Sequence, residues 1–174
     1  AYFNITDSTP TVKVTTNDPY GEIVPQVISL DSGTVTVDVT FKVANTTWTV
    51  FVSDNDYENV LVDYTSSQCP VTPSDADRLL VLLPGESQEP GSSSGKTGQV
   101  DFSTDSGIQP AVAGTEFNVT VCACDVSWNT NPGYNPTVDI NTTDSYATYP
   151  SQITLSEGTT TFAMTLVVAS THTI

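Results

Sequence analysis

The chain has 174 residues, with 20 Asp and Glu against four Lys and Arg, a net charge of −16. This length is enough for one domain with a continuous core that needs no metal or disulfide to fold. So large an excess of negative charge, with no basic patch to neutralise phosphates, excludes nucleic acid as a partner. No run of about 18 apolar residues is present, so no transmembrane helix is predicted.

The first 16 residues, AYFNITDSTPTVKVTT, begin with apolar side chains and end in a strand-like alternation. Chain termini are usually polar and frayed, so apolar residues there suggest that something covers them. We expect residues 1–16 to form an extended strand that adds to a sheet. Its apolar side chains are Tyr2, Phe3, Ile5, Val12 and Val14.

Alternating apolar and polar residues, separated by turns rich in Gly, Pro, Asn and Asp, predict strands along the rest of the chain. The clearest run, residues 34–43, should pair with 47–52 as a hairpin. Pro25 cannot donate to a ladder, which predicts an edge strand or a bulge there. Residues 66–78 and 84–98 are predicted loops, the second a mobile one. The expected strands are 23–30, 34–43, 47–52, 60–64, 78–83, 99–102, 115–125, 137–141, 152–155 and 160–169.

An acidic loop at residues 53–59 offers several oxygen ligands. The carboxylates of Asp54, Asp56 and Glu58 alternate with amide and other side chains, a pattern that can wrap calcium. The loop lacks the glycine and distal glutamate of an EF-hand, and acidic loops in acidic proteins are usually only solvated. Both readings stay open, and no other cofactor is expected.

The chain has three cysteines, Cys69, Cys122 and Cys124. Cys122 and Cys124 are two apart in a predicted strand, so they share its outer face and cannot easily bridge each other. We therefore expect a disulfide from Cys69 to one of them, with the third thiol free or intermolecular.

Several features favour a secreted, extracellular or cell-surface protein. The acidic surface suits an environment in which salt or divalent ions screen it. The start at Ala1, without methionine, suggests a mature product whose signal peptide has been removed. The N-x-S/T sequons fit a secreted glycoprotein, although a Thr-rich chain also produces them by chance. They begin at Asn4, Asn45, Asn118 and Asn141.

The predicted strands indicate an all-β fold, a jelly-roll or immunoglobulin-like two-sheet sandwich with an extended N-terminal strand. Residues 1–16 would be that strand and residues 17–174 a single β-sandwich domain. The only histidine, His172, lies near the far end of the chain, and no nucleophile-base or zinc-ligand pattern is visible. We therefore expect no enzymatic activity.

The open edge of a sandwich can recruit a partner strand. If residues 1–16 complete the sheet of another copy, repeated head-to-tail contact builds a filament. The start Ala1-Tyr2-Phe3-Asn4, followed by an extended polar segment, resembles that of biofilm-matrix fibre subunits of the TasA/camelysin family and related archaeal bundling pilus and thread subunits. The resemblance implies a secreted jelly-roll domain whose N-terminal strand complements its neighbour.

A secreted carbohydrate-binding or adhesin module is the alternative. The turn at residues 128–136, WNTNPGYNP, offers rings that stack on sugars and amides that bind hydroxyls. Such Asn-Pro-Gly turns are also common as plain turns with anchoring rings. The aromatic residues of the late loops are Trp128, Tyr134, Tyr146 and Tyr149.

Overall fold

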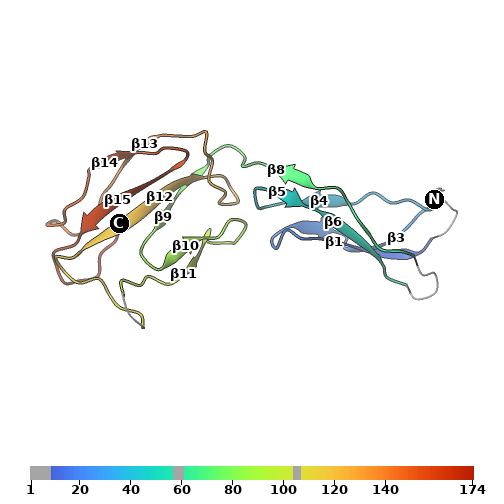
Figure 1. Ribbon diagram of the computed structural model, residues 1–174, viewed down its shortest axis with the longest axis horizontal. Coiled ribbons are helices and arrows are strands. Elements are labelled where there is room, and N and C mark those ends of the chain that lie inside the picture. The colour runs from blue at the N-terminus through green and yellow to red at the C-terminus, as the bar shows by residue number, and fades with distance from the viewer. Residues whose placement is uncertain (1–8, 57–60, 104–106) are drawn as a thin grey trace. The chain divides into compact units, whose positions relative to one another are not determined.

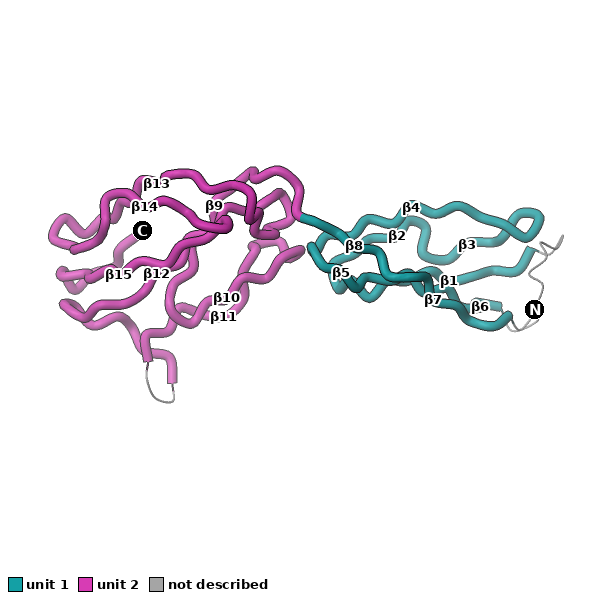
Figure 2. Tube along the Cα trace, turned by 45° about the horizontal axis from the view of Figure 1, so that its top comes forward, with its two compact units in different colours: residues 1–72 teal, residues 73–174 magenta. Residues whose placement is uncertain are grey.

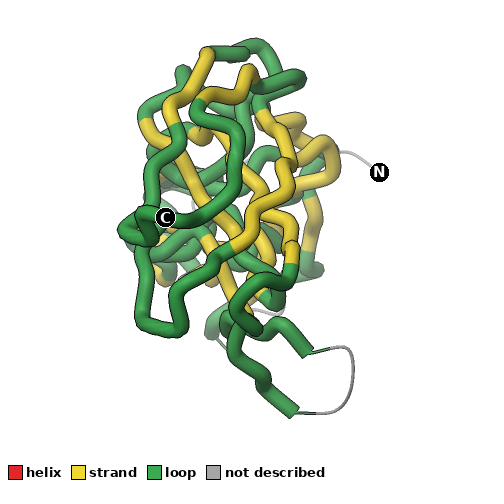
Figure 3. The backbone as a smooth tube through the Cα atoms, turned by 90° about the vertical axis from the view of Figure 1, so that its left-hand side faces the viewer, coloured by secondary structure: helices red, strands yellow, loops and turns green. Residues whose placement is uncertain are grey.

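The computed structural model describes residues 9–56, 61–103 and 107–174 (Figure 1). All regular structure in these ranges is β-strand, without helices (Figure 3), which confirms the predicted all-β class. The chain divides into two compact units, Ala1–Thr72 and Pro73–Ile174 (Figure 2). The sequence had suggested one domain over residues 17–174. The boundary falls inside the predicted loop 66–78.

Unit 1, Ala1–Thr72, contains a four-stranded antiparallel sheet and two strand pairs. The sheet has the order β3 (Val27–Ser29), β1 (Thr11–Thr16), β6 (Val50–Asp54) and β7 (Tyr64–Thr65). The pairs are β2 (Glu22–Val24) with β4 (Asp38–Thr40), and β5 (Asn45–Trp48) with β8 (Cys69–Val71). Val12 and Val14 of β1 pack with Ile23 of β2, so the core joins the four-stranded sheet to the β2–β4 pair.

β1 is an interior strand of its own sheet. Val12 is in register with Ile28 of β3 on one side and with Asp54 of β6 on the other. The strand expected over residues 1–16 is confirmed for Thr11–Thr16. Because β1 is paired on both edges, Thr11–Thr16 belong to the fold of unit 1 and do not extend away from it.

Unit 2, Pro73–Ile174, is centred on a three-stranded antiparallel sheet. Its order is β15 (Thr159–Thr165), β12 (Glu116–Cys124) and β9 (Arg78–Leu82), close to three predicted strands. Two hairpin-like pairs accompany it, β10 (Glu86–Gln88) with β11 (Lys96–Gly98) and β13 (Thr137–Asp139) with β14 (Gln152–Thr154). The main core packs β12 and β15 residues, such as Val119 and Met164, against Ile153 of β14.

Three predictions about the strands were wrong. The alternating run 34–43 forms a strand only at β4, which pairs with β2, whereas β6 pairs with β1 and β7. The expected hairpin between 34–43 and 47–52 is therefore absent. The predicted mobile loop 84–98 instead contains the β10–β11 pair, and residues 99–102 form no strand. Alternation of apolar and polar residues indicates that one face of a strand is buried, but it does not identify the strand with which it pairs.

Candidate functional site

An apolar groove runs along unit 1. Its volume is about 440 Å³, and its floor is formed by Val12 and Val14 of β1 with Val50 and Val52 of β6. These valines also belong to the core of the unit, so the groove opens onto the core. Such a volume lies within the range of about 300–1,000 Å³ that is typical of ligand pockets.

Apolar side chains with large exposed fractions form the rim of this groove. Val35 is 37% exposed, Leu61 43%, Tyr64 71% and Val62 94%. Scattered exposed apolar residues are ordinary on a protein surface, whereas these four side chains line the same groove. We refer to these four side chains as the groove rim.

The segment 34–37 beside the groove carries the alternating pattern of a strand without a strand partner. Thr34 bridges back to Asp31, and β4 begins only at Asp38. Among the described residues, Val35, Thr36 and Val37 take part in no ladder. Val35 and Val37 nevertheless line the apolar groove, so this irregular segment forms part of its wall.

The expected donor-strand residues are divided by the structure. Val12 and Val14 are 5% and 3% exposed in the core of unit 1, so in this fold they fill no pocket of a neighbour. Tyr2, Phe3 and Ile5 lie outside the described residues. Val12 and Val14 are therefore not available as donor residues in this fold, and the donor role of Tyr2, Phe3 and Ile5 stays a prediction.

The acidic loop is anchored by its own carboxylates. Asp54 Oδ1 accepts a bond of 2.9 Å from the Asp56 N–H, and its Oδ2 accepts one of 2.8 Å from the Leu61 N–H. Asp56 Oδ2 accepts from the Thr11 N–H at 2.9 Å. Glu58 lies outside the described residues. Within the described ranges no group of three or more His, Cys, Asp or Glu is arranged to hold a metal ion, and calcium here stays a prediction.

Buried aspartates that accept backbone N–H groups recur along the chain, and the sequence interpretation missed them. Asp18, Asp125 and Asp144 are 3%, 3% and 2% exposed, and each accepts from the residue two positions later. This is the Asx-turn, whose sequence signal is an aspartate opening a turn. Their partners lie mainly on the backbone, so these three carboxylates stabilise turns of the fold.

Backbone donors lower the pKa of Asp144 and of a further aspartate, Asp101. The Val168, Tyr146 and Val167 N–H groups stabilise the Asp144 carboxylate and hold its pKa below its usual value, and nearby His172 contributes in the same direction. The N–H groups of Gln109 and Ser103 lower the pKa of Asp101 in the same way. Each carboxylate is therefore most stable in its ionised form.

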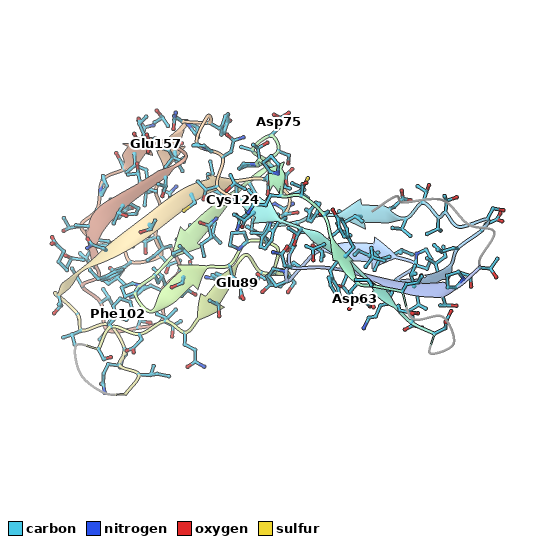
Figure 4. The ribbon with its side chains drawn as sticks, turned by 45° about the vertical axis from the view of Figure 1, so that its right-hand side comes forward. Asp63, Asp75, Glu89, Phe102, Cys124 and Glu157 are labelled. Carbon is cyan, nitrogen blue, oxygen red and sulfur yellow. The ribbon has the colours of Figure 1, made fainter. Side chains whose placement is uncertain are left out.

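The expected disulfide is absent, because all three cysteines are free. Cys69 is exposed on β8 of unit 1, whereas Cys122 and Cys124 are buried in unit 2, where Figure 4 labels Cys124. Burial raises the pKa of Cys124 to about 11, and neighbouring Cys122 adds to the effect. These two thiols behave as small core side chains.

Both cysteines project from the face of β12 that was expected to be wet. They pack with Leu80, and Trp128 lies against this cluster. Gln88 of β10 donates to the Trp128 carbonyl at 2.6 Å, and its other amide atom accepts from Thr130 at 3.0 Å. The β10–β11 pair thus ties the aromatic turn to the sheet.

Trp128 is enclosed and does not form an open sugar-stacking platform. A Cβ placed on Gly95 would lie 2.3 Å from the indole ring, and the Arg78 guanidinium carbon lies 4.7 Å from the ring centroid. Tyr149 packs against the core. Tyr134 and Tyr146, 52% and 72% exposed, remain the accessible rings of this group.

The sequons occupy different environments. Asn118 on β12 and Asn141 after β13 have exposed side chains. Asn45 on β5 is half-buried, and its Oδ1 accepts from the N–H groups of Thr46 and Thr47. Asn4 lies outside the described residues. Glycosylation stays a prediction at all four.

No family model, curated protein or solved structure matches this chain. Among the described residues, no helix is long and apolar enough to cross a membrane.

Proposed function

We propose that the protein is a non-enzymatic structural subunit of an extracellular filament, a pilus or biofilm-matrix fibre, in which copies join head to tail by donor-strand complementation. The subunit would be secreted, and each of its units would act as a small β-sandwich. The likeness of residues 1–4 to the start of TasA/camelysin-type fibre subunits agrees with this role.

The groove rim of unit 1 is the observation that carries the proposal. An apolar groove lined by four exposed hydrophobic side chains, next to residues 35–37, which take part in no ladder among the described residues, favours the addition of an apolar segment. The chain has a net charge of −16, so copies repel one another except where apolar contact overcomes the repulsion.

Electron microscopy of the purified full chain tests the proposal. At high concentration in physiological salt we expect filaments, and a variant lacking residues 1–8 should remain monomeric with an unchanged circular dichroism spectrum. A full chain that stays monomeric under these conditions would contradict a filament role.

A carbohydrate-binding or adhesin module is the second candidate, favoured by the exposed rings of Tyr134 and Tyr146. Exposed tyrosines stack on the apolar faces of sugars. A glycan array should then show binding that is lost in Tyr134→Ala or Tyr146→Ala and kept in Tyr149→Phe. Binding that is absent from the native chain eliminates this candidate.

A further inference from the structure

We infer that an N-linked sugar on Asn118 lies in a second groove, on unit 2, and covers apolar side chains that the polypeptide leaves open. This groove has a volume of about 560 Å³, and we refer to it as the unit 2 groove. The sequon by itself predicts only a site of modification, whereas the inference states what the attached sugar contacts and stabilises. It goes beyond the filament role and shares only secretion with it.

The sequon lies in the wall of the unit 2 groove. Asn118 and Thr120, its first and last residues, are two apart on β12 and therefore project from the same face. Both residues line the groove. The Asn118 side chain is exposed, and its neighbour across the β12–β15 ladder is Ala163, which is also exposed. So short a neighbour leaves room for a sugar above this part of the sheet.

The polypeptide cover over this face of β12 ends beside the sequon. The two cysteines of β12 lie on the same face and are covered by Trp128 and the β10–β11 pair. β9 pairs with β12 only over Thr120–Cys124, and Pro84, which cannot donate to a ladder, follows soon after β9. Among the described residues, Glu116–Val119 therefore pair with β15 alone. A sugar on Asn118 continues the cover from the point where the polypeptide stops.

The side chains of the groove are suited to a sugar. Phe102 and Phe117 line it as half-buried rings, with centroids 4.8 Å apart in an edge-to-face arrangement. Val112, also in the lining, is 67% exposed, so apolar surface is open to solvent. A pyranose ring presents C–H groups that pack on aromatic rings, and hydroxyls that donate to carboxylates such as that of Glu116 in the same lining.

Attachment of the sugar requires a donor that secretory glycosylation systems provide, a sugar linked to a lipid phosphate. The Asn118 Nδ2 atom attacks the anomeric carbon of this sugar. The nitrogen–carbon bond forms, the bond from that carbon to the phosphate oxygen breaks, the lipid phosphate leaves, and Nδ2 loses one proton. The acceptor needs only the Asn-Val-Thr motif, which residues 118–120 supply.

Two other sequons lack a comparable site. The Asn45 side chain is half-buried and already accepts from the N–H groups of Thr46 and Thr47. Asn141 lines a groove of about 270 Å³ whose aromatic ring, Phe162, is only 8% exposed. A sugar on Asn141 has no open ring in that groove to pack on. Asn141 is therefore the matched control for Asn118 within unit 2.

Production of the full chain in eukaryotic secretory cells and in the bacterial cytosol tests the inference. Glycopeptide mass spectrometry of the secreted chain should find sugar on Asn118. Asn118→Gln should lower the melting temperature of unit 2 in the secreted chain by about 4 °C or more, the shift expected when a domain of this size loses one aromatic contact. The same change should have no effect in the bacterial chain, which receives no sugar, and Asn141→Gln should have little effect in either chain.

Two further measurements separate packing of the sugar from loss of the asparagine amide. Thr120→Val keeps Asn118 but removes the sequon, so it should lower the melting temperature more in the secreted chain than in the bacterial one, whereas Thr120→Ser keeps the sequon and should not. Nuclear Overhauser contacts should join the first sugar to the Phe117 ring.

An unoccupied Asn118 would overturn the inference, as would an attached sugar without these contacts or without the difference between the two hosts. Filaments of a secreted chain with a bare Asn118 would refute this inference and leave the filament role standing. A packed sugar on a chain that stays monomeric would refute the filament role alone.

Discussion

Asp125 shows how single carboxylates hold the turns of this chain. Its two oxygens accept from the N–H groups of Ser74, Ser127 and Asn129 and from the Asn129 side chain, at 2.9–3.2 Å. Asp125 is only 3% exposed, so little water could accept these hydrogen bonds if the carboxylate were removed. One residue therefore joins the start of unit 2 to the turn after β12.

Replacing Asp125 by alanine should destabilise unit 2 by about 3 kcal/mol, because several buried backbone donors lose a charged acceptor. Urea unfolding of the full chain in a Trp48→Phe background, in which Trp128 is the remaining tryptophan, measures the change by fluorescence. Asp75→Ala, at an exposed position in the same unit, is the control and should change stability by less than about 0.5 kcal/mol. Equal effects would show that the Asp125 bonds contribute little.

The lowered pKa of Asp144 predicts that acid reduces the stability of the fold. Its folded pKa lies below its usual value of 3.8, which describes the unfolded chain, so its ionised form stabilises the fold above that pH. This stabilisation is lost as the pH falls through the lower folded pKa. Asp144→Asn should therefore be less stable than the native chain near neutral pH and should lose less stability on acidification. Thermal melts across an acid series measure both, and parallel curves would contradict the role.

At the scale of elements, the β10–β11 pair and the turn at Trp128 cover the second face of β12, so that both faces of this strand are buried. Val119 and Val121 are buried in the main core, and Cys122 and Cys124 are buried on the other face. The pair approaches so closely that Gly95, with φ +75°, has no room for a side chain beside Trp128. A strand buried on both faces resists opening, so β12 should be the most stable strand of unit 2.

Gly95→Ala should displace Trp128 from the second face of β12 and so expose the buried thiols of Cys122 and Cys124. In the native chain Cys69 should react quickly with a thiol reagent, whereas Cys122 and Cys124 react only on unfolding. Gly95→Ala should speed the slow reaction, since the new Cβ clashes with the indole ring. Gly114→Ala is the matched control, with φ +81° but nothing near its Cβ, and should cost only about 1 kcal/mol of backbone strain. Similar rates in both variants would contradict a covering role.

At the scale of the whole molecule, each unit contains its own core. The buried residues around Val119 all lie within Pro73–Ile174, and those around Val12 lie within Ala1–Thr72. A fragment of residues 73–174 should therefore fold alone. Its amide NMR spectrum should overlay on the matching signals of the full chain, and a collapsed, poorly dispersed spectrum would show that the units depend on each other.

The net charge of −16 also predicts how assembly responds to salt. Repulsion between copies extends over about 10 Å at 0.1 M ionic strength and about 3 Å at 1 M. If the apolar groove joins the copies, raising sodium chloride should speed filament growth measured by light scattering. Growth that slows with salt would instead indicate that ion pairs hold the copies together.

The sequence alone determined the β class and the longest strands. Runs such as 115–125 and 160–169 repeat every two residues, and a period of two is a local property that needs no partner to be read. Turn-forming residues are also a local signal, so they marked the ends of most strands. The interrupted strand at Pro25 was likewise predictable, since β2 ends before it and β3 begins after it.

Tertiary structure decided which strands meet and which side chains remain open. The sequence favoured β1 as a strand that connects copies. In the structure β1 pairs with β3 on one edge and with β6 on the other, and both strands follow it in sequence. The same holds for the cysteines, which a distant pair of strands and Trp128 cover. The alternation in residues 34–37 predicted a paired strand, whereas in the described part of the chain residues 35–37 take part in no ladder, and Val35 and Val37 line the groove. Pairing depends on long-range contacts, and a local pattern does not contain them.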